Sequence, residues 1–91
     1  MTQVAAGSLR NAFCFIGAGG HHAGRSFFGG YCCFNDVVIA IAEVRGTTPL
    51  RRIAIVDTDA HHGDGTRDLV RDDPAVLHLC VCGTASQSSD G

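Results

Sequence analysis

The feature that most constrains the fold is a β-branched run, residues 52–56, that ends at Asp57 and passes into a glycine-rich loop. A short apolar run bounded by turn residues is typical of a central parallel strand. Similar runs predict strands over 75–82 and over 12–16, the latter ending at Gly17. Parallel strands need long crossover connections, which are usually helices. The chain therefore predicts an α/β fold.

Two helices are predicted between these strands. Residues 35–45 form the first, with Asn35 or Asp36 as its cap and Gly46 at its end. It is apolar on nearly all sides, so we expect it to be buried. Residues 66–71 form the second. The order strand, helix, strand, helix, strand implies a parallel sheet whose sites lie at the carboxyl ends of the strands.

Composition narrows the class of protein. The 91 residues suffice for one domain, and 45% of them are hydrophobic, which argues against disorder. The net charge of -2 gives no general attraction for nucleic acid or an anionic membrane. No apolar run approaches the ~18 residues of a membrane span, and no signal peptide is recognisable. Because the cysteine count of five is odd, we expect reduced thiols and a cytoplasmic protein.

The densest chemistry lies in the segment DTDAHHGDG, at the end of the central strand. Alternate residues of an extended chain point the same way, so Asp57, Asp59 and His61 share one side. Carboxylate oxygen and imidazole nitrogen both bind zinc at about 2.0–2.2 Å. An isolated DxH is more often a capped strand end. Here the density of acids and imidazoles at a sheet's carboxyl edge favours a metal site.

A second loop, residues 17–30, contains six glycines around the tandem His21–His22. Imidazole titrates near neutral pH, which suits proton transfer. A carboxylate behind each ring would fix its tautomer, and Asp57 and Asp64 are available for that purpose. Alone, such a pair is as consistent with surface histidines. Beside the DTDAHHGDG loop, it indicates an active site.

Three segments in fixed order, GAGGHHA, GGYCCFND and IAIVDTDAHHGDGT, resemble the zinc-dependent histone deacetylase superfamily. This group includes acetoin-utilisation proteins and acetylpolyamine amidohydrolases, and it shares an α/β fold with arginases. The resemblance runs from about Phe13 to Val81. It implies that residues 1–91 form one incomplete deacetylase-like domain, a partial three-layer parallel sheet of the arginase–deacetylase type.

The resemblance also implies an ion site. Asp59 and His61 match two of the family's three zinc ligands, and Asp57 matches the partner of His21. The same ligand set accepts Fe²⁺. The family binds a monovalent cation such as K⁺ nearby, through Asp57 and backbone oxygens around Asp59 and His61.

The remaining implied roles concern the substrate. His21 and His22 match the tandem histidines, with His22 as the general base and acid and Asp64 as its partner. Gly30 and Tyr31 match the glycine–aromatic pair beside the channel for the acylated amine. The implied substrate is an acetyl-lysine protein or an acetyl-polyamine, hydrolysed by zinc-activated water.

The departures from the pattern matter. The third zinc ligand and the oxyanion-stabilising tyrosine of the family have no match in this chain. The family's Ser-Leu-His reads Cys80-Val81-Cys82, which puts the cation site in doubt. We therefore expect a fragment with little or no activity in isolation. With His78, these cysteines could bind a metal, but their place on an apolar strand favours core packing, as it does for Cys32 and Cys33.

Three alternatives remain open. The DxH motif also opens two-metal phosphoesterase sites, although the later Gly-Asn-His type motif is absent. DAHHGD is similar to the binuclear manganese site of arginase-like ureohydrolases. A non-catalytic remnant or binding module of the same fold is the third. In each case the open edges of a small sheet predict an oligomer or poor solubility.

Overall fold

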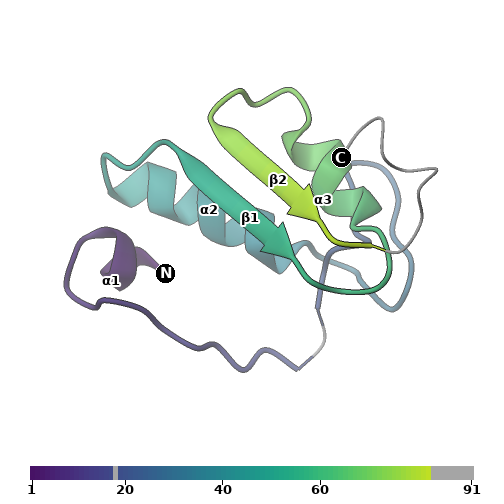
Figure 1. Cartoon of the computed structure of the whole chain (residues 1–91), viewed down its shortest axis with the longest axis horizontal. Helices are drawn as coiled ribbons and strands as arrows, with labels where there is room; N and C mark the ends of the chain where they lie inside the picture. The colour runs from purple at the N-terminus through teal and green to yellow at the C-terminus, as the bar shows by residue number, and fades with distance from the viewer. Residues whose placement is uncertain (18, 83–91) are drawn as a thin grey trace.

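The computed structural model describes residues 1–17 and 19–82, so the polar tail after Cys82 lies outside the described residues. The elements in chain order are α1 (Thr2–Ala5), α2 (Asp36–Thr47), β1 (Ile53–Asp57), α3 (Asp64–Val70) and β2 (Val76–Cys80). The two strands pair in parallel in one sheet, with helices between them in sequence. The predicted α/β class is confirmed (Figure 1).

The register of the sheet brings the two functional strand ends together. Ile53 pairs with Val76, and Asp57 pairs with Cys80 at the carboxyl edge. Helix α3 follows β1 after a short loop and leads into β2, so it forms the crossover connection between the two parallel strands. The backbone N–H of Val81 extends the pairing by donating to the carbonyl of Asp57 at 3.0 Å. Backbone pairing therefore extends to the edge that the sequence predicts to carry the site.

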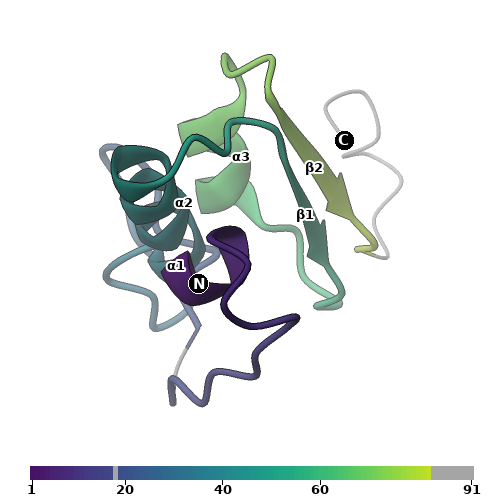
Figure 2. The ribbon, with the colours of Figure 1, turned by 90° about the vertical axis from the view of Figure 1, so that its left-hand side faces the viewer.

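The sheet is covered on one face only within the described residues. Figure 2 shows α2 and α3 on the same side of the two strands. Side chains at alternate strand positions point toward these helices and are at least partly buried, whereas those on the other face are exposed. The exposed set is Ala54, Val56, Leu77 and Leu79.

Helix α2 is capped as the sequence predicts, but it is not buried all round. Asn35 occupies the N-cap, and its side chain accepts a hydrogen bond from the backbone N–H of Val38. Only Ile41 and Val44 are buried, while Ile39 is exposed. The expectation of complete burial is wrong because only one side of the helix packs against neighbouring elements, which include α1 and α3. No helix within residues 1–17 and 19–82 has the length and apolar composition needed to cross a membrane.

Residues 12–16, predicted as a buried strand, form no strand. Phe13 and Phe15 are 88% and 92% exposed. The prediction failed because a strand needs a paired neighbour for its backbone N–H and C=O groups, and neither β1 nor β2 pairs with this segment. The run keeps the composition of a strand without a partner to pair with.

The cysteines divide between two environments. Cys32 is buried, as expected, but Cys33 is exposed, so its interpretation as a core residue is wrong. Cys80 and Cys82 are half-buried rather than enclosed. All five cysteines of the chain lie among the described residues, and each is a free thiol.

Candidate active site

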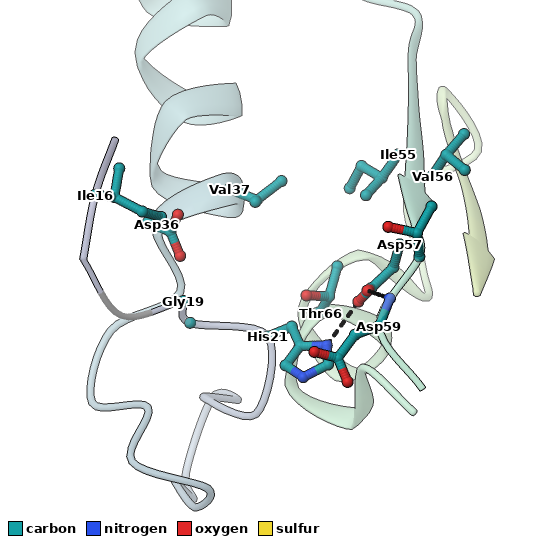
Figure 3. A pocket seen from close by; sticks show the side chains of 12 residues that line it. Ile16, Gly19, His21, Asp36, Val37, Ile55, Val56, Asp57, Asp59 and Thr66 are labelled. Carbon is teal, nitrogen blue, oxygen red and sulfur yellow. Dashed lines mark hydrogen bonds and ion pairs between the residues drawn. The ribbon is translucent and has the colours of Figure 1, made fainter. Parts of the chain in front are cut away.

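Two histidine–aspartate pairs form the centre of the site. His21 Nδ1 lies 2.7 Å from Asp57 Oδ2, and His22 Nδ1 lies 2.6 Å from Asp64 Oδ1. The two imidazole rings are neighbours, with centroids 4.1 Å apart. Figure 3 shows His21 reaching from its loop toward Asp57 at the end of β1. These are the two pairings that the sequence led us to expect.

The backbone of the tandem-histidine loop is fixed to the start of α3. The carbonyl of His21 accepts hydrogen bonds from the N–H groups of Gly65 at 2.9 Å and Thr66 at 3.2 Å. These donors belong to the first turn of a helix, where N–H groups have no partner within the helix. Gly65 is required here for space, since a Cβ would collide with the backbone of Ala23. The loop and the helix therefore hold each other in place.

Asn35 connects three parts of the site. Its Nδ2 donates to the carbonyl of Ala23 at 3.2 Å and to Thr66 Oγ1 at 3.0 Å, while its Oδ1 caps α2. The side chain is buried, at 4% exposure, so these partners replace water. Sequence reasoning found the cap but missed the two further bonds. No local signal could have shown them, because both partners are distant in sequence.

Asp59 and His61 face each other on the loop after β1. Asp59 Oδ1 accepts from the backbone N–H of His61 at 2.8 Å and lies 3.1 Å from His61 Nδ1. The backbone hydrogen bond, reinforced by the ring, lowers the pKa of Asp59 and keeps it ionised. Two atoms each bound to tetrahedral zinc at about 2.0–2.1 Å lie roughly 3.3 Å apart. The pair therefore fits one ion as two of its ligands.

The site residues surround one open hollow of about 380 Å³. Its lining comprises Gly19, His21, His22, Gly30, Tyr31, Cys32, Asp59 and His61. Asp57 and Asp64 complete the set as the partners of the two histidines. A second hollow of about 550 Å³, drawn in Figure 3, shares His21 and Asp59 and extends along β1. All eight residues singled out in the sequence are thus brought together.

A tight turn holds the aromatic side chain at the rim. Gly29 and Cys32 close the turn, with the N–H of Cys32 donating to the Gly29 carbonyl at 2.8 Å. Gly30 and Tyr31 both have positive φ, 54° and 66°, the pattern of a type I′ turn. A Cβ on Gly30 would collide with the His22 ring. Tyr31 is 98% exposed, so its ring is presented to solvent beside the hollow.

The comparisons with known proteins agree with this geometry. The sequence profile of the histone deacetylase domain matches residues 1–87. The chain belongs to the histone deacetylase family. Human histone deacetylase 9 is 40% identical over 80 residues, and the human polyamine deacetylase HDAC10 is 41% identical over 76 residues.

The match covers only part of each relative. It spans 88% of this chain but 8% of histone deacetylase 9, and 84% of this chain but 11% of HDAC10. The solved HDA15 HD domain superposes with a TM-score of 0.81 at 30% identity, over 87% of this chain and 23% of that chain. The two strands and their helices are therefore part of a deacetylase fold.

This part of the deacetylase fold places two further groups of side chains that could hold a metal ion near the site. Within residues 1–17 and 19–82, the groups of three that could hold an ion are His62–Cys80–Cys82 and Asp57–His78–Cys80. Neither includes Asp59 or His61, so the described part of the chain brings no third side chain to that pair. Sequence reasoning weighed metal binding by the strand residues and preferred core packing, and it did not connect them with His62 or Asp57, because it treated the strand without its neighbouring loop.

His78 is the least expected member of these groups. It is 6% exposed, and neither ring nitrogen has a hydrogen-bond partner among the described residues. Burial, reinforced by the nearby Arg67, lowers the pKa of His78 and favours the neutral ring. Burial likewise raises the pKa of the Cys80 thiol. Both shifts disfavour the charged forms of these side chains beneath the site.

Proposed function

We propose that this chain carries part of the active site of a metal-dependent deacylase that hydrolyses an acetyl-lysine or acetyl-polyamine type amide. The observation that carries the proposal is the pair of adjacent histidine–aspartate dyads facing the Asp59–His61 pair across one hollow. Family membership supports the deacylase over the ureohydrolase and phosphoesterase alternatives. We assign residues 1–91 to a single incomplete domain, acting in the cytoplasm because its five cysteines are free.

Asp59 and His61 are the proposed ligands of a zinc ion, with Fe²⁺ as the other metal that this ligand type accepts. A bound ion would supply Lewis acidity to the acyl carbonyl and to a water molecule. The ionised Asp59 and the 3.1 Å separation of the two donor atoms support this role. The proposed monovalent cation, such as K⁺, would use Asp57 and nearby backbone oxygens.

His22 is the proposed general base and acid. Its Nδ1 is held by Asp64, so Nε2 is left to take a proton from water and deliver one to the leaving amine. His21, held by Asp57 in the same way, lies beside it and donates or accepts through its own Nε2. The aspartates orient the rings and fix which nitrogen is free.

Gly30 and Tyr31 are proposed to contact the substrate. Gly30 lets the turn approach the His22 ring, and Tyr31 presents an aromatic face at the rim of the hollow. An aromatic wall suits the methylene stem of an acylated lysine or polyamine. The polar hydroxyl of Tyr31 also leaves a hydrogen-bonding group at the entrance.

The proposal is tested in two parts. Catalytic zinc sites have three protein ligands and an open position, and this chain supplies two, so the isolated 91 residues should be inert toward acetyl-lysine peptides and acetyl-polyamines. Robust zinc-dependent turnover by the purified chain would refute that expectation.

The second part replaces the matching segment of an active histone deacetylase with residues 13–81 of this chain. The chimaera should hydrolyse an acetyl-lysine peptide, and His22→Ala should lower kcat by about 10²–10⁴-fold. Asp59→Ala should abolish turnover and zinc retention together. The exposed Cys33→Ser is the matched control that leaves both unchanged. A folded chimaera whose turnover survives His22→Ala would sink the assignment.

A further inference from the structure

A cluster of sulfur and nitrogen ligands lies at the carboxyl end of the sheet, outside the hollow of the candidate active site. His62 Nδ1 lies 3.7 Å from Cys82 Sγ. Together with Cys80 Sγ, the three donor atoms all lie within 4.8 Å of one another. The proposed deacylase chemistry uses none of these three side chains, so the cluster needs its own explanation.

The local structure brings the three side chains together for simple reasons. Cys80 ends β2 and Cys82 follows two residues later, so along an extended chain their side chains point the same way. His62 lies on the loop between β1 and α3. That loop is tied to the strand end, because the N–H of Gly63 donates to Cys80 Sγ at 3.4 Å. All three side chains are half-buried.

The separation of His62 and Cys82 matches that of two ligands on one metal ion. Zinc binds thiolate sulfur at about 2.3 Å and imidazole nitrogen at about 2.0–2.1 Å, so a tetrahedral ion separates the two atoms by roughly 3.6 Å. The observed separation between His62 Nδ1 and Cys82 Sγ is 3.7 Å. Soft sulfur donors favour zinc or monovalent copper over hard cations such as K⁺ or Mg²⁺. Geometry and ligand chemistry therefore point to the same class of ion.

We propose that His62, Cys80 and Cys82 form a second, sulfur-rich metal site that binds Zn²⁺ and leaves a fourth position open to an exogenous ligand. Binding deprotonates the two thiols and releases their protons. The site is separate from the Asp59–His61 pair, which contributes to neither group of three and has no sulfur. One sheet edge thus carries two ion sites of different chemistry.

The test is a titration of the reduced 91-residue chain with Co²⁺ under anaerobic conditions. Thiolate coordination to Co²⁺ produces a charge-transfer band in the near ultraviolet, which carboxylate and imidazole ligands alone do not produce. Wild-type protein should show this band with a stoichiometry of one ion, and Zn²⁺ should remove it by competition. Cys82→Ser and His62→Ala should each weaken the apparent Co²⁺ affinity by at least about tenfold.

Matched controls separate this site from the others. Asp59→Ala with His61→Ala should retain the band, because the candidate catalytic pair contains no thiolate. Cys14→Ser with Cys33→Ser should also retain it, because both cysteines are exposed and lie outside the cluster. A band that is absent from wild type, or an apparent Co²⁺ affinity that is unchanged in both Cys82→Ser and His62→Ala, overturns the proposal.

A second measurement covers the case in which a ligand variant fails to fold. Alkylation of the wild-type chain with and without Zn²⁺, followed by peptide mass spectrometry, should show protection of Cys80 and Cys82 and unchanged labelling of Cys14 and Cys33. Equal labelling of Cys80 and Cys82 in both conditions overturns the proposal. Oxidation of these two cysteines to a disulfide in the presence of Zn²⁺ overturns it as well.

Discussion

The carboxyl edge of this small sheet and its uncovered face differ in how many of their groups have interaction partners. At the carboxyl edge, the loop of His21, the start of α3 and the cap of α2 are joined by hydrogen bonds among buried or half-buried groups. On the face turned away from the helices, Val56, Leu77 and Leu79 remain exposed. The hydrogen bonds at the polar edge therefore join residues that all lie in this chain, whereas the apolar face has no covering layer among the described residues.

This difference separates the interactions of a deacetylase domain that form within these residues from those that need a further layer. Hydrogen bonds at the site join segments that are all present here, so their directionality fixes the geometry locally. Apolar burial instead needs a covering layer, and the chain covers 8% to 11% of the length of its human relatives. Substitutions at the hydrogen-bonded edge should therefore change stability more than substitutions on the exposed apolar face.

The largest effect should come from Gly65→Ala. Its Cβ would collide with the backbone of Ala23, which cannot rotate away, so the loop or α3 must move. We expect a loss of about 3 kcal/mol in the free energy of unfolding, the upper end for an overpacked site. Urea denaturation followed by circular dichroism measures this loss.

Gly46→Ala is the matched control for that substitution. Gly46 lies in α2, and a Cβ there would meet nothing within 4 Å. Alanine should therefore stabilise the protein by up to about 1 kcal/mol through helix propensity. Equal effects of the two substitutions would show that contact with Ala23 does not fix the loop.

Asn35→Ala should cause the next largest loss in the free energy of unfolding. It removes the cap of α2 and leaves the Ala23 carbonyl and Thr66 Oγ1 without their donor. Loss of a cap costs about 1 kcal/mol and an unpaired buried group costs about 1 kcal/mol at the low end, so we expect a total loss of about 2 kcal/mol, less than for Gly65→Ala. Asn35→Asp keeps the cap but not the donor, so unfolding experiments on both variants separate the two contributions. If aspartate behaves as wild type, the cross-links contribute nothing.

A smaller effect of opposite sign is expected for Tyr31→Asn. Tyr31 has a φ of 66° and a fully exposed side chain, so the substitution relieves backbone strain without removing packing. Asparagine tolerates this conformation, and we expect a gain of under about 1 kcal/mol. Thermal melting checks the sign, and destabilisation would mean that the ring makes contacts that stabilise the turn.

The smallest effect on stability should come from the exposed apolar face of the sheet. Val56→Thr combined with Leu79→Thr places a β-branched residue, which suits a strand, at both positions and makes the exposed face polar. Unfolding free energy should change by less than about 0.5 kcal/mol. Sedimentation velocity should nevertheless show less self-association, because an exposed apolar sheet face favours it. A wild-type chain that sediments as a monomer would contradict this reasoning.

Sequence reasoning succeeded where local pattern and chemistry agree. The β-branched run predicts β1, the Asn-Asp pair predicts the start of α2, and the resemblance predicts which aspartate meets which histidine. Each of these depends on residues whose partners are present in the chain.

Sequence reasoning failed where a segment has the composition of a buried region but lacks the contacts that would bury it. Phe13 and Phe15 have the composition of a buried strand but no strand beside them, and Cys33 lies at an exposed position in an apolar stretch. The His62–Cys82 contact was also missed, since it joins residues 20 apart across a loop and a strand end. Such contacts follow from the register of β1 and β2, which the sequence does not specify by itself.

The carbonyl of His21 has a consequence beyond the anchoring of its loop. Because the bonds to α3 come from the main chain, they remain when the imidazoles are replaced. The main-chain position of residue 21 is therefore set separately from the chemistry of its side chain. Substitutions at residue 21 should therefore change the side chain while the main-chain bonds to α3 persist, so this position is suited to carrying other chemistries.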